Sequence, residues 1–250
     1  MDKNEMRQML QNALDSVDEA KNTLEELKEE FEDEEKEASS DLKCPMNVFY
    51  MSLADVDKLV YGKFSALVFH PGDVIVSGKY RFRVIDVGNM QSINARPDEK
   101  HVLLRIEQFI TDGTPFDNDG CNEWEKSSMR KYLNGEFLEM LSEEDRSAVK
   151  YVELHTGRKD AVSTDRVFLL SAKELGFDVD EAGKAIPFFT GENAADSRIY
   201  TDGDGDARWY FTRSPNPGDA HLVRLVYTDG SLYYHSALNG HGAVPACMLI

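Results

Sequence analysis

Residues 229–250 read DGSLYYHSALNGHGAVPACMLI, and this stretch is decisive for the fold. The dipeptide Asp229-Gly230 favours a tight hairpin turn. Residues 243–250 are almost entirely apolar, which is typical of a buried strand. The sequence therefore predicts a hairpin and a terminal core strand, with residues 231–241 held between them.

Short strands and capped helices precede this segment. Period-two patterns predict a hairpin over residues 73–87 and strands at residues 102–106, 166–170, 208–212 and 221–227. Serine caps predict three helices: one after Ser52, one after Ser127 or Ser128 that is broken at Asn134-Gly135, and one after Ser142. Strands at both ends with helices between them predict an α+β fold rather than alternating βαβ units.

The N-terminal region has a different character, because residues 5–38 lack glycine and proline and carry a regular apolar stripe. One heptad position holds Leu10, Val17, Leu24 and Phe31, and the other holds Ala13, Ala20 and Leu27. This seam predicts a coiled coil that makes the protein a homo-oligomer. Docking of the stripe on the chain's own globular domain is the alternative. We therefore expect an acidic heptad helix over residues 1–40, a helical linker over residues 41–67 and an α+β domain over residues 68–250.

The charge of the chain excludes several classes of partner. The net charge is −18, and residues 1–40 alone hold 14 acidic and 5 basic side chains. Lysine and arginine form no stripe that would bind phosphates, so no nucleic-acid partner is expected. No run of about 18 apolar residues predicts insertion into a membrane. The first residues lack the apolar core of a signal peptide, so we expect a cytoplasmic protein or a component of a phage particle.

Four motifs follow one another in a fixed order. They are Trp124 with the serines and the Arg-x-Tyr-Leu-Asn run of residues 127–134, then DRVFLLS at 165–171, WYFTRSP at 209–215 and GAVPA at 242–246. Together they resemble a bacterial and phage domain family of unknown function with the motifs D-x-x-F-L-L-S, W-W-L-R-S-P and G-V-R-P-A. Tyr210 replaces the family's second tryptophan, and Val244 replaces its arginine. The likeness covers residues 68–250.

The C-terminal half of that family resembles the C-type lectin fold. The same fold serves formylglycine-generating enzymes and the variable proteins of diversity-generating retroelements. The resemblance implies a compact domain in which the terminal strands meet, with ligand-facing loops near the C-terminus. It implies a non-catalytic ligand-binding protein, of the kind found among those variable proteins. A formylglycine-generating type of enzyme and a structural phage or assembly component are the alternatives.

The segment before the last strand is the predicted recognition surface. Its candidate ligand-binding residues are Tyr233, Tyr234, His235, Ser236, Asn239 and His241. Tyrosine, serine and asparagine are the residue types of adaptable binding surfaces, and tyrosine adds large contact area at little entropic cost. We expect a protein or glycan ligand. An ordinary loop between two strands is the alternative.

Asp202, Asp204 and Asp206 alternate with glycines, as acidic residues do in some calcium loops. The segment departs from the EF-hand pattern, because Ala207 is its sixth residue and Arg213 its twelfth. Calcium is therefore a candidate ligand of these three carboxylates, and a solvated turn is the alternative. No other cofactor is expected.

No set of residues indicates catalysis. The histidines are scattered, and neither a phosphate loop nor a Gly-x-Ser-x-Gly motif is present. Cys121 and Cys247 are expected to be inert core thiols, and Trp124 and Trp209 are expected to pack in the core. Arg213 is expected to fix a turn through hydrogen bonds.

Overall fold

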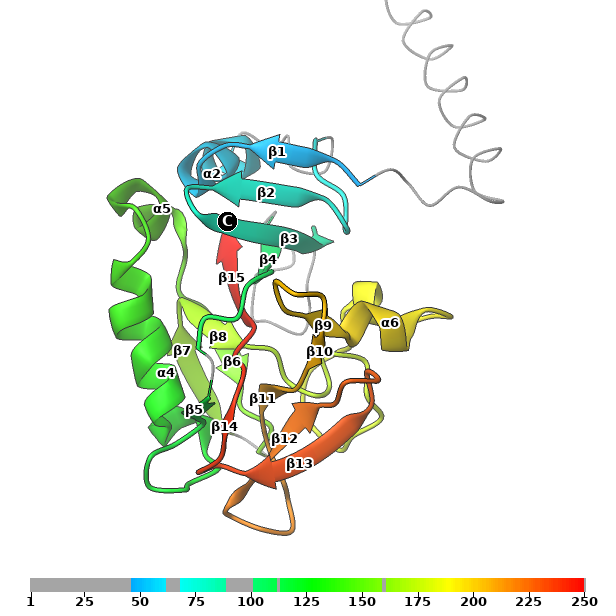
Figure 1. The fold of residues 1–250 in the computed structure, drawn as a ribbon. Coiled ribbons are helices and arrows are strands. Elements are labelled where there is room, and N and C mark those ends of the chain that lie inside the picture. Colours follow the sequence, from blue (N-terminus) through cyan, green and yellow to red (C-terminus); the bar gives the residue numbers. More distant parts are fainter. Residues whose placement is uncertain (1–45, 62–67, 89–100, 112, 159–160, 250) are drawn as a thin grey trace, which may run out of the picture. The chain divides into compact units, whose positions relative to one another are not determined.

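A six-stranded sheet with the order β1-β2-β3-β4-β15-β8 forms the largest part of the domain, as Figure 1 shows. The computed structural model describes residues 46–61, 68–88, 101–111, 113–158 and 161–249, which fall in the compact unit Met46–Ile250. The sheet contains β1 (Val48–Tyr50), β2 (Val74–Ser77), β3 (Tyr80–Val87), β4 (Val102–Ile106), β8 (Val167–Leu169) and β15 (Pro245–Leu249). The acidic helix predicted over residues 1–40 lies outside the described residues.

The last strand, β15, lies inside this sheet. All five of its residues are buried, and it pairs antiparallel with both β4 and β8. Cys247, for example, lies between Leu104 and Val167. The apolar terminal strand predicted from the sequence is thereby confirmed, because a strand that is buried and paired on both sides needs apolar residues without alternation.

Residues 46–61 belong to the same unit, whereas the sequence analysis placed them in a linker and began the domain at residue 68. β1 pairs in parallel with β2, and α2 (Leu53–Tyr61) buries Leu53, Val56 and Val60. The backbone N–H of Leu53 also donates to the buried carboxylate of Asp145, at 2.6 Å. The compact unit therefore begins at Met46, because a three-residue strand is too short to show a period in the sequence.

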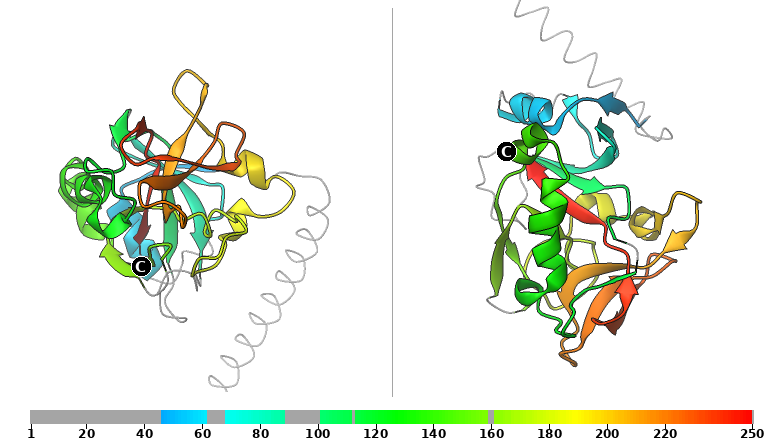
Figure 2. Two further views of the ribbon diagram at one scale, coloured as in Figure 1. Left: turned by 90° about the horizontal axis from the view of Figure 1, so that it is seen from below. Right: turned by 60° about the vertical axis from the view of Figure 1, so that its left-hand side comes forward.

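The helical part follows the predicted caps. Its elements are η1 (Trp124–Lys126), α4 (Ser128–Tyr132), the π-helical turn η2 (Leu133–Phe137), α5 (Glu143–Ala148), η3 (Pro187–Phe189) and α6 (Ala194–Arg198). Ser127 and Ser142 accept hydrogen bonds from the third residue after them, as N-caps do. Figure 2 shows the helix that contains α4 along one side of the domain, where η2 contacts β8.

The break predicted at Asn134 is instead a π-helical turn. The Asn134 amide donates to the carbonyl oxygen of Val167, and its carbonyl oxygen accepts from the N–H groups of Arg166 and Val167. Asn134 thus ties the helix to β8 and the residue before it. A π-turn at this position accommodates the tie without ending the helix.

A buried ion pair connects β8 with β11 (Tyr210–Pro215) and confirms the structural role predicted for Arg213. The Arg213 guanidinium is fully buried and contacts both carboxylate oxygens of Glu174. It also donates to the carbonyl oxygens of Leu169 and His155, at 2.6 and 2.7 Å. Glu174 in turn exchanges two hydrogen bonds with Ser171, in the pattern of a capping box, although the segment forms a turn and no helix.

The remaining strands form small antiparallel sheets. The largest is β11-β12-β13, with β12 at Leu222–Val226 and β13 at Leu232–Ser236. In the two-stranded sheets, β5 (Thr114–Pro115) pairs with β14 (Gly240–His241), and β6 (Val152–His155) pairs with β7 (Val162–Asp165). A further pair joins β9 (Tyr200–Thr201) to β10 (Ala207–Arg208). The domain is thus α+β with mostly β-structure. In the described part of the chain, no helix has the length and apolar character needed to cross a membrane.

Candidate functional site

The β11-β12-β13 sheet carries most of the predicted recognition residues. β12 and β13 pair from Leu222↔Ser236 to Val226↔Leu232, which confirms the hairpin predicted at Asp229-Gly230. Gly230 has a φ of +77°, and an added Cβ would overlap the backbone of Ala195. Glycine is therefore required at this turn both by its conformation and by the close neighbour.

Tyr233 and Tyr234 lie on β13, outside the core. Their exposed fractions are 51% and 49%, and their rings lie parallel with centroids 5.3 Å apart. Because about half of each residue is exposed, substitution of either tyrosine removes mainly surface rather than core packing. His235 and Ser236 are half-buried on the same strand, and Asn239 is exposed in the turn that follows.

The alternation of the strand divides these residues between two faces of the sheet. Tyr233 pairs with Leu225, and His235 pairs with Val223. Both side chains therefore extend from the face of the sheet that packs against the core. Tyr234 lies opposite Arg224. The structure therefore brings His235 and His241 together. Tyr234 extends from the other face, although its ring stacks on that of Tyr233.

Five aromatic side chains, Trp209, Tyr227, Tyr233, His235 and His241, form a connected group that we name the aromatic cluster. The indole of Trp209 is at its centre, with ring centroids 4.4 Å from Tyr227 and 5.3 Å from His241. Tyr227 continues the group to Tyr233 at 6.0 Å, and the two histidine rings are 4.9 Å apart. Trp209 was expected in the core but is half-buried at its edge.

His241 has an unusual environment within the aromatic cluster. Its ring stacks on Trp209, with 25° between the planes, and its Nε2 atom is buried without a hydrogen-bond partner among the described residues. Burial, reinforced by the neighbouring His235, lowers the pKa of His241 to about 4. The imidazole is therefore neutral at neutral pH. His235 is oriented separately, because its Nδ1 lies 2.7 Å from the side-chain amide nitrogen of Asn239.

A cavity of about 230 Å³ adjoins the aromatic cluster. The residues that line it are Phe109, Ala207, Arg208, Trp209, Thr228, Gly240, His241 and Gly242. The backbone at residue 242 packs closely, because a Cβ added at Gly242 would overlap the Phe109 ring. Glycine at position 242 is therefore needed to bring the His241 backbone under the cavity.

The three candidate calcium ligands do not converge. Oδ1 of Asp202 accepts from the backbone N–H groups of Asp204 and Asp206, both at 3.0 Å, and its Oδ2 accepts from Arg208 at 2.6 Å. The carboxylate thus closes its own turn, as Asx-turns do. Among the residues with described positions, no group of three or more His, Cys, Asp or Glu side chains could hold a metal ion. The geometry supports the alternative, a solvated turn.

The thiols have contrasting environments. Cys247 is buried in β15, and this burial raises its pKa to about 12. A thiol of this kind is a poor nucleophile, because the thiolate is the reactive form. Cys121 is half-buried in the loop before η1. The indole of Trp124 is fully buried and donates to Asp165 at 2.9 Å, which confirms its place in the core.

Residues 99–250 match a family described as a domain of unknown function, DUF6273. The chain belongs to this family. The DUF6273 region contains the aromatic cluster and its cavity, along with β4, β8 and β15 of the large sheet. β1, β2 and β3 precede it in the sequence and complete the sheet. No curated protein and no solved structure matches the chain.

Proposed function

We propose that this DUF6273 protein is a non-catalytic binding protein whose aromatic cluster and adjoining cavity recognise a glycan. The observation that carries the proposal is the cavity beside the aromatic cluster, which is lined by the stacked rings of Trp209 and His241. Such rings offer a flat surface on which a sugar ring can pack.

The chemistry of the cluster favours a sugar over a charged ligand. Aromatic rings offer flat apolar surface to the C–H face of a sugar ring, and the polar tips of tyrosine and histidine can bond its hydroxyl groups. The neutral His241 ring attracts neither anions nor cations by charge. A volume of about 230 Å³ leaves room for about one sugar ring.

The finer structural hypotheses belong to the same proposal. A relation to the C-type lectin fold is supported by the order of the sequence motifs and by the exposure of Tyr233 and Tyr234 in the segment before β15. The same position suits a variable protein of a diversity-generating retroelement. Residues 1–40 would make a homo-oligomer, and several copies of a weak site would gain avidity. Such a protein would act in the cytoplasm or on a phage particle.

A glycan array probed with the full chain tests the proposal. Binding should depend on Tyr233 and His241, so Tyr233→Ala and His241→Ala should each lose binding while thermal melting shows a folded domain. Tyr61→Ala is the matched control, because Tyr61 is 85% exposed on α2. The chain has two tryptophans, Trp124 and Trp209. In a Trp124→Phe variant the tryptophan fluorescence comes from Trp209 alone, so a change in it reports on the cavity that Trp209 lines.

Two results would contradict the proposal. One is an array without a bound glycan. The other is glycan binding that survives both substitutions. If the aromatic cluster binds a protein and no glycan, the proposed binding surface is correct but the proposed class of ligand is wrong. The buried position of Cys247 argues against the formylglycine-generating alternative.

A further inference from the structure

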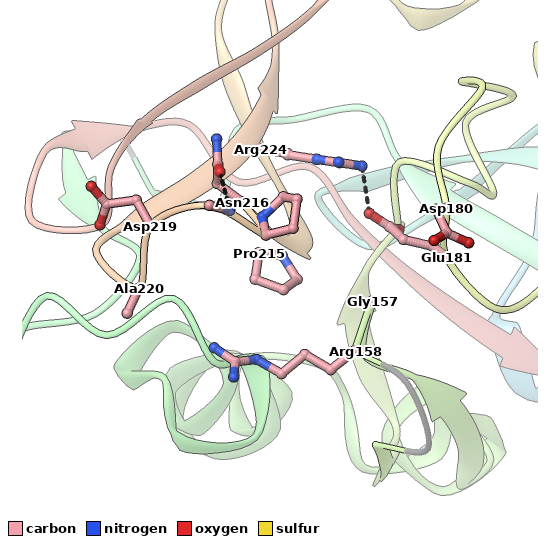
Figure 3. A pocket seen from close by; sticks show the side chains of 11 residues that line it. Gly157, Arg158, Asp180, Glu181, Pro215, Asn216, Asp219, Ala220 and Arg224 are labelled. Carbon is pink, nitrogen blue, oxygen red and sulfur yellow. Dashed lines mark hydrogen bonds and ion pairs between the residues drawn. The ribbon is translucent and has the colours of Figure 1, made fainter.

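A second cavity, of about 610 Å³, lies apart from the aromatic cluster. Its walls come from the β6–β7 loop, the segment before η3, the β11–β12 loop and one residue of β12. None of the six predicted recognition residues and none of the aromatic cluster lines it. Figure 3 shows the side chains of Arg158 and Arg224 on opposite sides of Pro215.

Arg224 is held in place by a buried acid. Its Nη1 donates to Oε1 of Glu181 at 2.7 Å, and the Glu181 side chain is only 3% exposed. The other carboxylate oxygen of Glu181 accepts from the Ser214 hydroxyl at 2.6 Å. Burial raises the pKa of Glu181, while Ser214 and Arg224 act in the opposite direction. The remaining N–H groups of Arg224 make no hydrogen bond within the described structure.

Arg158 is held by a buried amide. Its Nη2 donates to Oδ1 of Asn122 at 2.8 Å, and Asn122 is fully buried. The Asn122 side-chain NH₂ group donates to the carbonyl oxygens of Asn216, Asp219 and Leu222 at 3.2, 2.8 and 2.9 Å. One buried side chain therefore fixes both an arginine of the cavity and the loop that forms its wall. Such support organises a binding site before its ligand arrives.

The wall between these two supports is also tightly built. Gly157 has a φ of +81°, and an added Cβ would lie 2.8 Å from Cδ of Pro215. Side chains are thus excluded where the β6–β7 loop meets β11. Pro215 and Pro217 give the cavity a rigid apolar surface between its charged groups.

Carboxylates complete the cavity. Asp180 is exposed beside Glu181, and Asp219 is exposed in the β11–β12 loop, where its Oδ1 accepts from the His221 N–H at 2.8 Å. In Figure 3 Asp180 and Asp219 lie on opposite sides of Pro215. Asp180 makes no ion pair among the described residues. The cavity thus offers guanidinium donors and carboxylate acceptors together.

This arrangement excludes ligands of a single charge. A polyanion such as a phosphate ester would meet Asp180 and Asp219 as well as the field of a chain with net charge −18. A simple cation would meet the two guanidinium groups. A neutral ligand that carries both charges satisfies both kinds of group. Free amino acids and short peptides are ligands of this kind, because each carries a terminal carboxylate and a terminal ammonium group.

We infer that this cavity binds a free amino acid or short peptide, with its carboxylate at Arg158 and its ammonium group at Asp180. Arginine binds a carboxylate through paired, charge-assisted hydrogen bonds. The Asp180 carboxylate accepts from the ammonium group in the same way. This inference is independent of the glycan proposal, because the two sites share no residue.

The test uses the full chain and a panel of free dipeptides that covers every common side chain, followed by ligand-observed NMR and calorimetry. The best dipeptide is then compared with its N-acetylated and C-amidated forms. Each blocked form should bind about tenfold more weakly or worse, because each loses a charge-assisted contact. Arg158→Gln and Asp180→Asn should weaken the free dipeptide to a similar extent.

Arg146→Gln is the matched control, because Arg146 pairs with Glu139 on the surface and does not line the cavity. It should leave dipeptide binding unchanged. Asp180 is exposed, so its variant should melt close to the parent. Arg158→Gln also removes the donor to the buried Oδ1 of Asn122, so it should lower the melting temperature by a few degrees while the domain stays folded. The inference is overturned if no dipeptide binds at millimolar concentration, if the blocked forms bind as well as the free one, or if the cavity variants bind like the control.

Discussion

Replacing Arg213 by methionine should destabilise the domain strongly. Methionine fills a similar volume but removes the guanidinium, which is fully buried and paired with Glu174. The Glu174 carboxylate would then be left buried without its cation, and the carbonyl oxygens of Leu169 and His155 would lose their donor. Removal of one partner of a buried ion pair costs about 3–5 kcal/mol.

Urea denaturation measures this loss as a lower midpoint with an unchanged slope. In a domain of this size each kcal/mol corresponds to about 2–4 °C, so the melting temperature should fall by roughly 10 °C. The exposed pair of Arg146 with Glu139 supplies the control. Arg146→Met should cost less than about 1 kcal/mol.

A second variant separates charge from packing. In Arg213→Met with Glu174→Gln no buried charge remains, and the glutamine oxygen can still accept from the Ser171 N–H. The double variant should therefore be more stable than Arg213→Met alone. A loss below about 1 kcal/mol for Arg213→Met, or a double variant that is less stable than the single one, would refute this reasoning.

Three further predictions concern the binding surface and the N-terminus. Gly242→Ala should lower stability by about 1–3 kcal/mol and weaken glycan binding, because the new Cβ overlaps the Phe109 ring; a denaturation curve checks the first effect. The pKa of His241 is lowered from 6.5 to about 4 in the folded state, so its contribution to stability is present above pH 6.5 and is lost as the pH falls towards 4. As the pH falls from 6.5 towards 4, the melting temperature should therefore decrease less in His241→Gln than in the parent. Light scattering should give a larger mass for the full chain than for one that starts at Asp41, with more than one copy per particle; equal monomeric masses would refute the coiled coil.

Local patterns were sufficient for most of the core elements. The hairpin of β2 and β3, the caps at Ser127 and Ser142 and the buried strand β15 each follow from residues that are neighbours in the sequence. Each has a period, a cap or a turn residue that acts over a few positions. Long-range partners are not needed to recognise them.

Hydrogen-bond partners that the sequence does not reveal, some distant and some local, account for what the sequence did not predict. Asn134 followed by glycine is typical of a helix break. In the structure its side chain instead forms hydrogen bonds with residues 166 and 167 and connects the helix to a strand. Asp202 has the spacing of a calcium loop, but Arg208 and the turn backbone occupy its carboxylate. The same residue types support both outcomes, and only the fold distinguishes them.

The candidate sites show the same division. The sequence indicated a C-terminal surface because tyrosine, histidine and asparagine gather there, and the structure joins Tyr233, His235 and His241 through Trp209. The role of Trp209 required the fold, since a tryptophan in an apolar strand normally packs in the core. The second cavity draws on separate loops, and its support by Asn122 joins residues 36 positions apart.

The two proposed binding sites both draw on residues of the sheet β11-β12-β13. Successive side chains of a strand leave opposite faces, so Tyr233 and His235 contribute to the aromatic cluster while the pair Arg224 and Tyr234 lies on the other face. Arg224 there lines the charged cavity. The two faces also differ in the interactions that position their side chains. Ring contacts position His235 and His241 on one face, and an ion pair with Glu181 positions Arg224 on the other. Substitutions on one face should consequently leave binding at the other intact, and loss of both activities in a folded Tyr233→Ala variant would show that the two faces are coupled.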